Sequence, residues 1–192
     1  MEKQKVKNGW YIWIPDFLHE IESEELFQVL YSDLSWEGGE IKLFGKIHEI
    51  PRKQVMFANK GLKYGYSGKQ LNVKDWNRTV LNIKNQIESE FNFDFNACLA
   101  NLYRDGNDSN GWHADNEEEL GKNPVIASIS LGATRTFKLK HLATKDKIDF
   151  QMTSGSLLIM GGEMQHYWKH QIPKTKRKVD SRINLTFRKL IS

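Results

Sequence analysis

The spacing of hydrophobic residues changes near residue 93, where a strand-like pattern begins. From Phe93 onward, short runs of alternating or continuous apolar residues predict β-strands. Turn signals such as Asp105-Gly106-Asn107 and Gly161-Gly162 separate these runs. Many short strands at this spacing indicate a sandwich or jelly roll. The expected strands are Phe95–Tyr103, Val125–Leu131, Thr136–His141, Ile148–Met152, Ser156–Met160, His166–Ile172 and Arg182–Arg188.

The first part of the chain mixes strand and helix. Trp10 to Ile14 is an apolar run, and Ser23 to Leu34 has helical spacing with acidic residues in its first turn. A second helix is expected from Asp75 to Phe91, with Asp75 as its N-cap. We expect both helices to cover one face of a sheet, so the predicted fold class is mostly β with flanking α-helices. The apolar positions of the second helix recur at intervals of three and four residues: Trp76, Val80, Ile83 and Ile87.

Length and composition favour one domain. The chain has 192 residues, which one hydrophobic core can fill, and no linker, low-complexity segment or internal repeat interrupts it. A hydrophobic share of 39% and a charged share of 27% exclude a disordered or fibrous protein. We therefore expect a single domain over residues 1–192, with a helical part over about 1–92 and a strand-rich core over about 93–192.

Charge and cysteine content indicate which partners and which cellular location suit the protein. A net charge of +4 and a pI near 9.0 permit a polyanionic partner. Cys98 is the one cysteine in the sequence, so we expect no internal disulfide, an intracellular location and a small buried side chain at this position. No apolar run is long enough to span a membrane, and the charged N-terminus lacks a signal-peptide core. We expect a soluble monomer of the bacterial cytoplasm or the eukaryotic nucleus, with no membrane partner.

Candidate metal ligands lie at the ends of strand-like segments. His113 and Asp115 form a His-x-Asp triplet, and two imidazoles with one carboxylate suit iron(II) while leaving coordination positions open. The triplet alone is a weak signal, because a surface histidine gives the same pattern. His170 offers a second imidazole within a strand-like segment downstream, and His166 competes with it for this role.

The last predicted strand carries an unusual set of polar residues. Positions 182, 184, 186 and 188 project to one face of a strand, whereas the apolar positions between them project to the other. Burying two guanidiniums is costly unless an anion meets them, and a dicarboxylic acid would do so through charge-assisted hydrogen bonds. The alternative is an exposed strand with its arginines in solvent and its apolar residues inside.

Together these motifs resemble the AlkB family of iron(II)- and 2-oxoglutarate-dependent dioxygenases, and within it the members that repair alkylated double-stranded DNA. The likeness runs from about residue 40 to the C-terminus and includes Asn101-Leu102-Tyr103 ahead of Asp105-Gly106. A match of several motifs in order over most of a chain is a specific signal. Other matching segments are Pro51–Gln54, Ser67-Gly68, Gly155–Leu158 and Arg182–Lys189.

The resemblance implies a double-stranded β-helix (jelly-roll) core with an N-terminal helix and hairpin extension that recognises nucleotides. It implies a catalytic iron held by His113, Asp115 and His170, because the family ligand stands where His170 stands relative to the two arginines. His166 is then a neighbouring pocket or packing residue. The 2-oxoglutarate ligands implied are Asn101, Tyr103, Arg182, Asn184 and Arg188, with Thr186 as a further candidate on the same face.

Two segments bear on a nucleic-acid substrate. Phe44, Gly45 and Lys46 lie in an expected hairpin ahead of Pro51 and are similar to the finger that fills the gap left by a flipped base. The alternative is a hairpin in which Phe44 simply covers the core. The run from Lys174 to Lys178 follows His170 and is expected to contact phosphates, although a solvated loop gives the same pattern. The cations of this run are Lys174, Lys176, Arg177 and Lys178, and Lys138 and Lys140 extend the basic surface.

Further residues are implied for the base. Arg52 resembles an arginine that contacts a DNA strand, and Tyr64-Gly65-Tyr66 aligns with aromatics that line the base pocket. Asn116 departs from the similar human family member that repairs double-stranded DNA, in which an acid directly follows the aspartate ligand, and this leaves the preferred base open. Glu117 comes next and offers an acceptor for an exocyclic amine.

The resemblance implies oxidative demethylation of bases such as 1-methyladenine and 3-methylcytosine, preferably in duplex DNA. Iron(II), oxygen and 2-oxoglutarate would give succinate, carbon dioxide and formaldehyde. The alternatives are an RNA demethylase of the same family, a protein-directed hydroxylase and a non-catalytic nucleic-acid-binding module.

Overall fold

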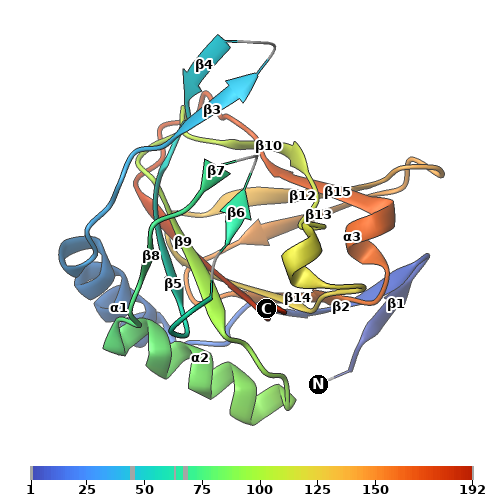
Figure 1. Ribbon diagram of the computed structural model, residues 1–192, viewed down its shortest axis with the longest axis horizontal. Helices are drawn as coiled ribbons and strands as arrows, with labels where there is room; N and C mark the ends of the chain where they lie inside the picture. The colour runs from blue at the N-terminus through green and yellow to red at the C-terminus, as the bar shows by residue number, and fades with distance from the viewer. Residues whose placement is uncertain (1, 44–45, 63, 67–68, 192) are drawn as a thin grey trace.

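The computed structural model describes residues 2–43, 46–62, 64–66 and 69–191 (Figure 1). For residues 41–43, 46–47, 66 and 69–70 it describes the backbone alone. Phe44 and Gly45 of the expected finger, and the matching Ser67-Gly68 pair, therefore lie outside the described residues. The same holds for the side chains of Lys46 and Tyr66.

Two facing sheets form the core of the fold. The larger sheet has the strand order β1-β2-β14-β11-β16-β9-β5-β8, and the smaller has the order β10-β15-β12-β13. The larger consists of β1 (Gln4–Val6), β2 (Gly9–Ile14), β5 (Lys53–Ala58), β8 (Val73–Lys74), β9 (Ala97–Tyr103), β11 (Ile126–Gly132), β14 (Leu157–Gly161) and β16 (Arg182–Arg188). The smaller consists of β10 (Asn110–His113), β12 (Arg135–His141), β13 (Lys147–Met152) and β15 (Trp168–Ile172).

From β9 to β16 the chain passes repeatedly between the sheets. Strands β9, β11, β14 and β16 belong to the larger sheet, and β10, β12, β13 and β15 belong to the smaller one. This crossing between facing antiparallel sheets is the double-stranded β-helix, so the prediction of a jelly roll is confirmed. Strands β1, β2, β5 and β8 extend the same larger sheet, so the residues before 93 share a sheet with the rest.

Short hairpins lie outside the two sheets. Strand β3 (Glu40–Leu43) pairs with β4 (Lys46–Glu49), which confirms a hairpin ahead of Pro51. Strand β6 (Gly65–Tyr66) pairs with β7 (Lys69–Gln70). In the view of Figure 1 the β3–β4 hairpin lies at the top, opposite α2, and the β6–β7 hairpin lies between the two.

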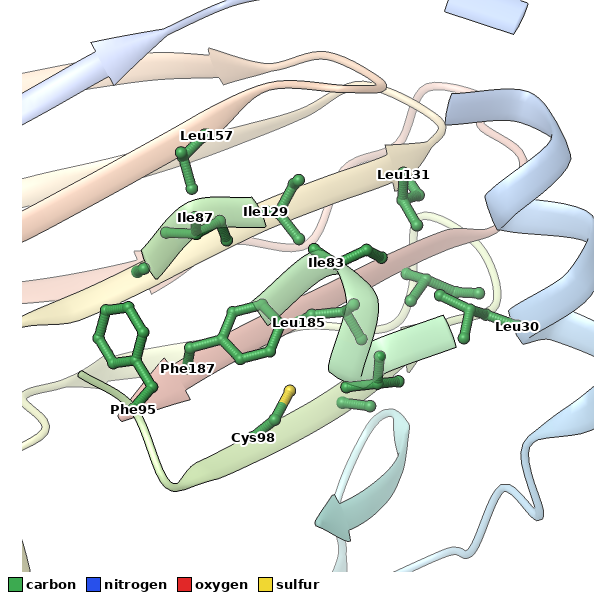
Figure 2. Packing of buried hydrophobic residues seen from close by; sticks show 14 of the residues in the cluster. Leu30, Ile83, Ile87, Phe95, Cys98, Ile129, Leu131, Leu157, Leu185 and Phe187 are labelled. Carbon is green, nitrogen blue, oxygen red and sulfur yellow. The ribbon is translucent and has the colours of Figure 1, made fainter. Parts of the chain in front are cut away.

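Helices α1 (Glu20–Asp33) and α2 (Arg78–Phe91) cover the outer face of the larger sheet, as predicted. Ile83 and Ile87 of α2 are buried against the sheet residues Leu185 and Phe187 (Figure 2). Each such side chain contributes about 1.5–3 kcal/mol when fully buried. Cys98 is buried in the same cluster, which confirms its expected packing role, and burial raises the pKa of its thiol.

The helix starts differ from the predicted ones. Helix α2 begins at Arg78, and its N-cap is Asn77, whose side chain accepts from the backbone N–H groups of Thr79 and Val80. The prediction of Asp75 as the cap is wrong, because Asp75 lies two residues before the cap position. Helix α1 begins at Glu20 instead of Ser23, because its first three residues are all exposed, Ile21 included, and so contribute no buried apolar position to the helical pattern.

The predicted strand from His166 to Ile172 is shorter than expected. Residues Met164–Tyr167 form the one-turn helix α3, and β15 begins at Trp168. Met164 and Gln165 are buried, whereas His166 and Tyr167 are exposed. Two buried residues followed by two exposed ones suit a helical turn, whereas a strand would alternate buried and exposed residues. Among the described residues, no helix is long and apolar enough to cross a membrane.

Candidate metal centre

The fold places two imidazoles opposite each other. Strand β10 ends at His113 and pairs antiparallel with β15, in which His170 is the direct partner of His113. The Cα atoms of direct partners in an antiparallel pair lie about 4.5–5.5 Å apart, so side chains on the same face contact each other. The ring centroids of the two histidines are 4.1 Å apart, and Phe137 of β12 stacks on His170 at 5.2 Å.

Asp115 completes the cluster from just beyond the end of β10. Its Oδ1 lies 3.8 Å from Nε2 of His113 and 4.0 Å from Nε2 of His170. One ligand atom from each of the three residues lies within 4.8 Å of the others. Among the described residues, this buried Oδ1 has no hydrogen-bond partner. A buried carboxylate oxygen facing two imidazole nitrogens fits a bound divalent cation, and the donor set suits iron(II).

Neighbouring groups orient the ligands. Nδ1 of His113 lies 2.7 Å from the carbonyl oxygen of Gly111, which can only accept, so Nδ1 carries the proton and Nε2 keeps its lone pair. The other carboxylate oxygen of Asp115, Oδ2, accepts from Nε and Nη2 of Arg188 at 3.2 and 2.7 Å. The carboxylate is thereby turned so that Oδ1 faces the histidines.

The electrostatics of the cluster favour metal binding at neutral pH. Burial lowers the pKa of His170 to about 3, and the pKa of His113 is lowered by burial as well. Burial alone would raise the pKa of Asp115, but Arg188 and the two histidines hold it below its usual range. Two neutral imidazoles and one carboxylate result, which are the protonation states that metal ligands require.

A polar ladder continues from the triad across the larger sheet. In β16, Arg182 pairs with Tyr103 of β9, and Asn184 pairs with Asn101. All seven residues of β16 are buried, so the alternative of an exposed strand with its arginines in solvent is wrong. The cavity at the triad is also lined by Asn101, Tyr103, Asn184, Thr186 and Arg188.

Arg182 lies within this ladder as a buried cation. Its Nη2 donates to the hydroxyl of Ser130 at 2.6 Å, while its Nε and Nη1 have no hydrogen-bond partner among the described residues. Burial and the neighbouring Arg135 lower the pKa of Arg182 to about 10, although Tyr103 opposes this, so the guanidinium is charged at neutral pH. A buried charge with unsatisfied donors calls for an anionic ligand.

Sequence reasoning missed several residues of the site. Ser128 and Ser130 of β11 accept from Asn184 and Arg182, and the alternation Ser128-Ile129-Ser130-Leu131 was a signal that could have found them. Asn110 lines the cavity, with its Nδ2 3.1 Å from Nε2 of His113. Gln165 accepts from the backbone N–H of Asp115, and no local sequence pattern indicates this contact.

Arg52 is buried at the edge of the site. It is only 4% exposed, and the contact with a DNA strand that the resemblance implies for it stays a prediction. Its Nε donates to Oδ1 of Asn101 at 2.9 Å, and its Nη1 donates to the carbonyl of Ser109 at 3.2 Å. Arg52 therefore lines the cavity and orients an expected 2-oxoglutarate ligand.

The expected base-pocket residues are only partly brought to the site. Tyr64 is fully buried, with its ring centroid 5.8 Å from the guanidinium of Arg188, and the base-lining role that the resemblance implies for it stays a prediction. Gly65 begins β6. Asn116 is exposed, and Glu117 is half-buried, with its pKa raised by burial and by Asp115. His166 is exposed on α3, outside the triad.

Exposed cations follow the metal-binding strand β15. The basic loop (residues 174–178) exposes Lys174, Lys176, Arg177 and Lys178. Its Thr175 N–H donates to the carbonyl of Gly106, which fixes the loop beside the turn that precedes β10. On the outer face of the smaller sheet, Lys140 lies directly between Lys147 and Lys169 of the neighbouring strands, and Lys138 pairs with Asp149 at 3.1 Å.

Comparisons with known proteins agree with this geometry. The chain matches the family model of the 2OG-Fe(II) oxygenase superfamily over residues 11–188. It is 35% identical over 181 residues to human DNA oxidative demethylase ALKBH2, a match that covers 88% of this chain and 69% of that protein. For the bovine counterpart, at 35% identity, the match covers 65% of the relative. Human alpha-ketoglutarate-dependent dioxygenase alkB homolog 3 is 33% identical over 184 residues, covering 91% of this chain and 64% of the relative. The chain thus spans about two thirds of the length of these relatives.

Solved structures show the same fold. The structure of OsALKBH1 matches with a TM-score of 0.61 at 20% identity, covering 97% of this chain and 100% of that one. A prolyl hydroxylase from Trichoplax adhaerens, in complex with a hypoxia inducible factor oxygen degradation domain peptide fragment, matches with a TM-score of 0.65 at 13% identity. That match covers 95% of this chain and 84% of the hydroxylase.

Proposed function

This chain belongs to the 2OG-Fe(II) oxygenase superfamily, whose cofactors are iron(II), 2-oxoglutarate and oxygen. We propose that it uses them to remove alkyl groups oxidatively from damaged bases in nucleic acid. The observation that carries the proposal is the buried His113–Asp115–His170 triad beside the polar ladder of β16. The relatives named as DNA oxidative demethylases support the choice of an alkylated base as substrate.

The triad would hold iron(II) through Nε2 of each histidine and Oδ1 of Asp115. When bound, iron(II) with oxygen and 2-oxoglutarate supplies the oxidising power that hydroxylates an N-alkyl carbon, and a hydroxymethyl product then releases formaldehyde. Arg188 keeps Asp115 ionised and turned toward the histidines. Phe137 covers one face of His170 and excludes water from that side of the site.

The polar ladder would bind 2-oxoglutarate. Arg182 has two donating nitrogens left over after its bond to Ser130, which suits one carboxylate of the co-substrate. Asn184 is fixed by Ser128 and by the carbonyl of Ile129, and Asn101 is fixed by Arg52, so both amides are held ready before the ligand arrives. Tyr103 and Thr186 complete the polar wall of the cavity.

Surface charge supports a nucleic-acid substrate. The basic loop follows β15 directly, so its four cations lie close in sequence to a metal ligand. The β3–β4 hairpin precedes Arg52, which borders the cavity just before β5. The gap-filling role that the resemblance implies for Phe44, which comes between β3 and β4 in the sequence, is part of the proposal. Lesions such as 1-methyladenine and 3-methylcytosine pair poorly, so extruding them from a duplex costs less than extruding a normal base. We infer duplex DNA as the preferred substrate on these grounds.

The proposal is tested with a panel of alkylated oligonucleotides. Purified protein with iron(II), ascorbate and 2-oxoglutarate should restore 1-methyladenine and 3-methylcytosine in duplex DNA, read by mass spectrometry of the bases. His113→Ala should abolish succinate formation, whereas His166→Ala should retain it, because His166 lies outside the triad. No repair of any lesion in DNA or in RNA by the wild type would overturn the proposal. Faster repair of single-stranded RNA than of duplex DNA would replace DNA by RNA as the substrate.

A further inference from the structure

Asp115 differs from the other metal ligands in how its backbone is held. His113 and His170 are direct partners in the β10–β15 pair, so the sheet fixes both. Strand β10 ends at His113, and the residues from Ala114 to Glu117 have no regular secondary structure. The position of Asp115 must therefore come from contacts other than the hydrogen bonds of the sheet.

The backbone contact comes from Gln165 of α3. Oε1 of Gln165 accepts from the N–H of Asp115 at 3.0 Å, across 50 positions of sequence. Gln165 is 2% exposed and Asp115 is 1% exposed, so water does not compete for the bond. A buried N–H without an acceptor costs about 1–3 kcal/mol, which makes this amide oxygen a strong constraint on the loop.

The contact joins the two segments that carry the ligands. Gln165 lies five positions before His170, and α3 leads directly into β15. Arg188 holds the carboxylate of Asp115 through Oδ2, while Gln165 holds its backbone. With both ends of the residue fixed, Oδ1 is left facing the two Nε2 atoms.

We propose that Gln165 is a positioning residue of the metal centre, which holds the backbone of Asp115 so that its carboxylate is in place before the metal binds. The inference rests on the metal site proposed above, but it does not depend on which nucleic acid is the substrate. Gln165 does not touch the metal position, so its effect is on affinity and geometry and not on the chemical step.

Cobalt(II) binding to the metal-free protein tests the proposal. Gln165→Met keeps the size of the side chain and removes the acceptor, and it should weaken cobalt(II) binding by about tenfold or more, as is usual for residues that orient ligands. Gln165→Glu keeps an acceptor oxygen at the same distance along the chain and should recover most of that affinity. Gln151→Met, at an exposed glutamine of β13, is the matched control and should bind as the wild type does.

A second readout uses the wild type itself. Hydrogen exchange at the Asp115 amide of the metal-free protein should be slowed well below the rate of an unprotected amide, and Gln165→Met should speed it by at least tenfold relative to Gln151→Met. Unprotected exchange in the wild type would overturn the proposal even if the methionine variant failed to fold. Equal cobalt(II) affinity in the wild type and Gln165→Met would overturn it as well. Normal metal binding without base repair would count against the proposed function alone.

Discussion

At the scale of single residues, the pair formed by Asp115 and Arg188 determines the charge state of the metal site. Both side chains are buried, and Oδ2 of Asp115 accepts from Nη2 of Arg188 at 2.7 Å. Burial alone would lower the pKa of Arg188, but Asp115 raises it above its ordinary value. Each charge therefore keeps the other ionised in a place where neither would be stable alone.

Removing one member of this pair should be costly. Arg188→Met is expected to destabilise the metal-free protein by about 3–5 kcal/mol, because it leaves a buried carboxylate without its cation. The double variant Asp115→Asn/Arg188→Met removes the orphaned charge and should regain part of the loss. Urea unfolding with a chelator present gives the free energies. Additive losses in the double variant would show that the two side chains do not stabilise each other.

Ser130 matters because it holds the arginine that we assign to 2-oxoglutarate. Ser130→Ala removes a hydrogen bond to a charged group, worth about 1.5 kcal/mol or more, which corresponds to about a tenfold rise in the KM for 2-oxoglutarate. The kcat should change little, because Ser130 orients the binding group and does not touch the reacting atoms. Succinate formation against 2-oxoglutarate concentration measures both constants. Ser32→Ala, at an exposed hydroxyl of α1, is the control, and an unchanged KM in Ser130→Ala would contradict the role.

At the scale of elements, polar side chains hold the connection between β9 and β10. Asp108 accepts from the backbone N–H of Arg104 and from its side chain, at 2.8–2.9 Å. Arg135 donates to the carbonyls of Asp105, Asp108 and Pro173. Pro173 directly precedes the basic loop. Arg135 therefore joins the β9–β10 connection, which leads to His113, to the start of the basic loop, which follows His170.

The Asp108 contacts should make the stability of this turn depend on pH. Burial alone would raise the pKa of Asp108, but the bonds from Arg104 lower it below its ordinary value of about 3.9. The ionised form therefore stabilises the fold above that value, and this contribution is lost as the pH falls through the lowered pKa. Asp108→Asn should cost about 1–2 kcal/mol at pH 7 and less near pH 3. Urea unfolding at both pH values measures this, and an equal cost at both would contradict it.

At the scale of the whole molecule, the two faces of the larger sheet have separate tasks. One face packs against α1 and α2 in an apolar cluster, and the other carries the polar ladder toward the smaller sheet (Figures 1 and 2). The basic loop and the Lys140, Lys147 and Lys169 row lie on the smaller-sheet side of the fold. The proposed phosphate contacts of the basic loop thus extend from the end of the strand that carries His170 to Lys178, which lines a pocket together with Glu20 and Glu24 of α1.

The basic loop should therefore contribute a salt-dependent part of DNA affinity. Replacing Lys176 and Arg177 by Ala should weaken binding to all duplex sequences alike. It should also reduce the slope of log affinity against log salt by about 0.9 for each phosphate that the loop no longer neutralises. Fluorescence anisotropy at several salt concentrations measures the slope. Arg78→Ala, at an exposed arginine of α2, should leave the slope unchanged, and a slope equal to the wild type in the loop variant would remove this loop from the interface.

Much of the fold and of the metal site could be predicted from local patterns. The period-two alternation of β16 placed Arg182, Asn184 and Arg188 on one face because a strand cannot do otherwise. The helical spacing of α2 likewise identified Ile83 and Ile87 as buried. The start of α2 could not be predicted in the same way, because its cap depends on one side chain, that of Asn77, and not on a repeated pattern.

The sequence by itself determined the kinds of ligand, the strand face that carries the two arginines, and the family. Only the tertiary structure decided that His113 faces His170, that Gln165 holds Asp115, and that Arg52 points into the cavity and not toward solvent. These contacts join segments about 50 residues apart or more, and such pairs depend on sheet order and register. A local pattern fixes the face on which a side chain lies, but strand pairing fixes what that face meets.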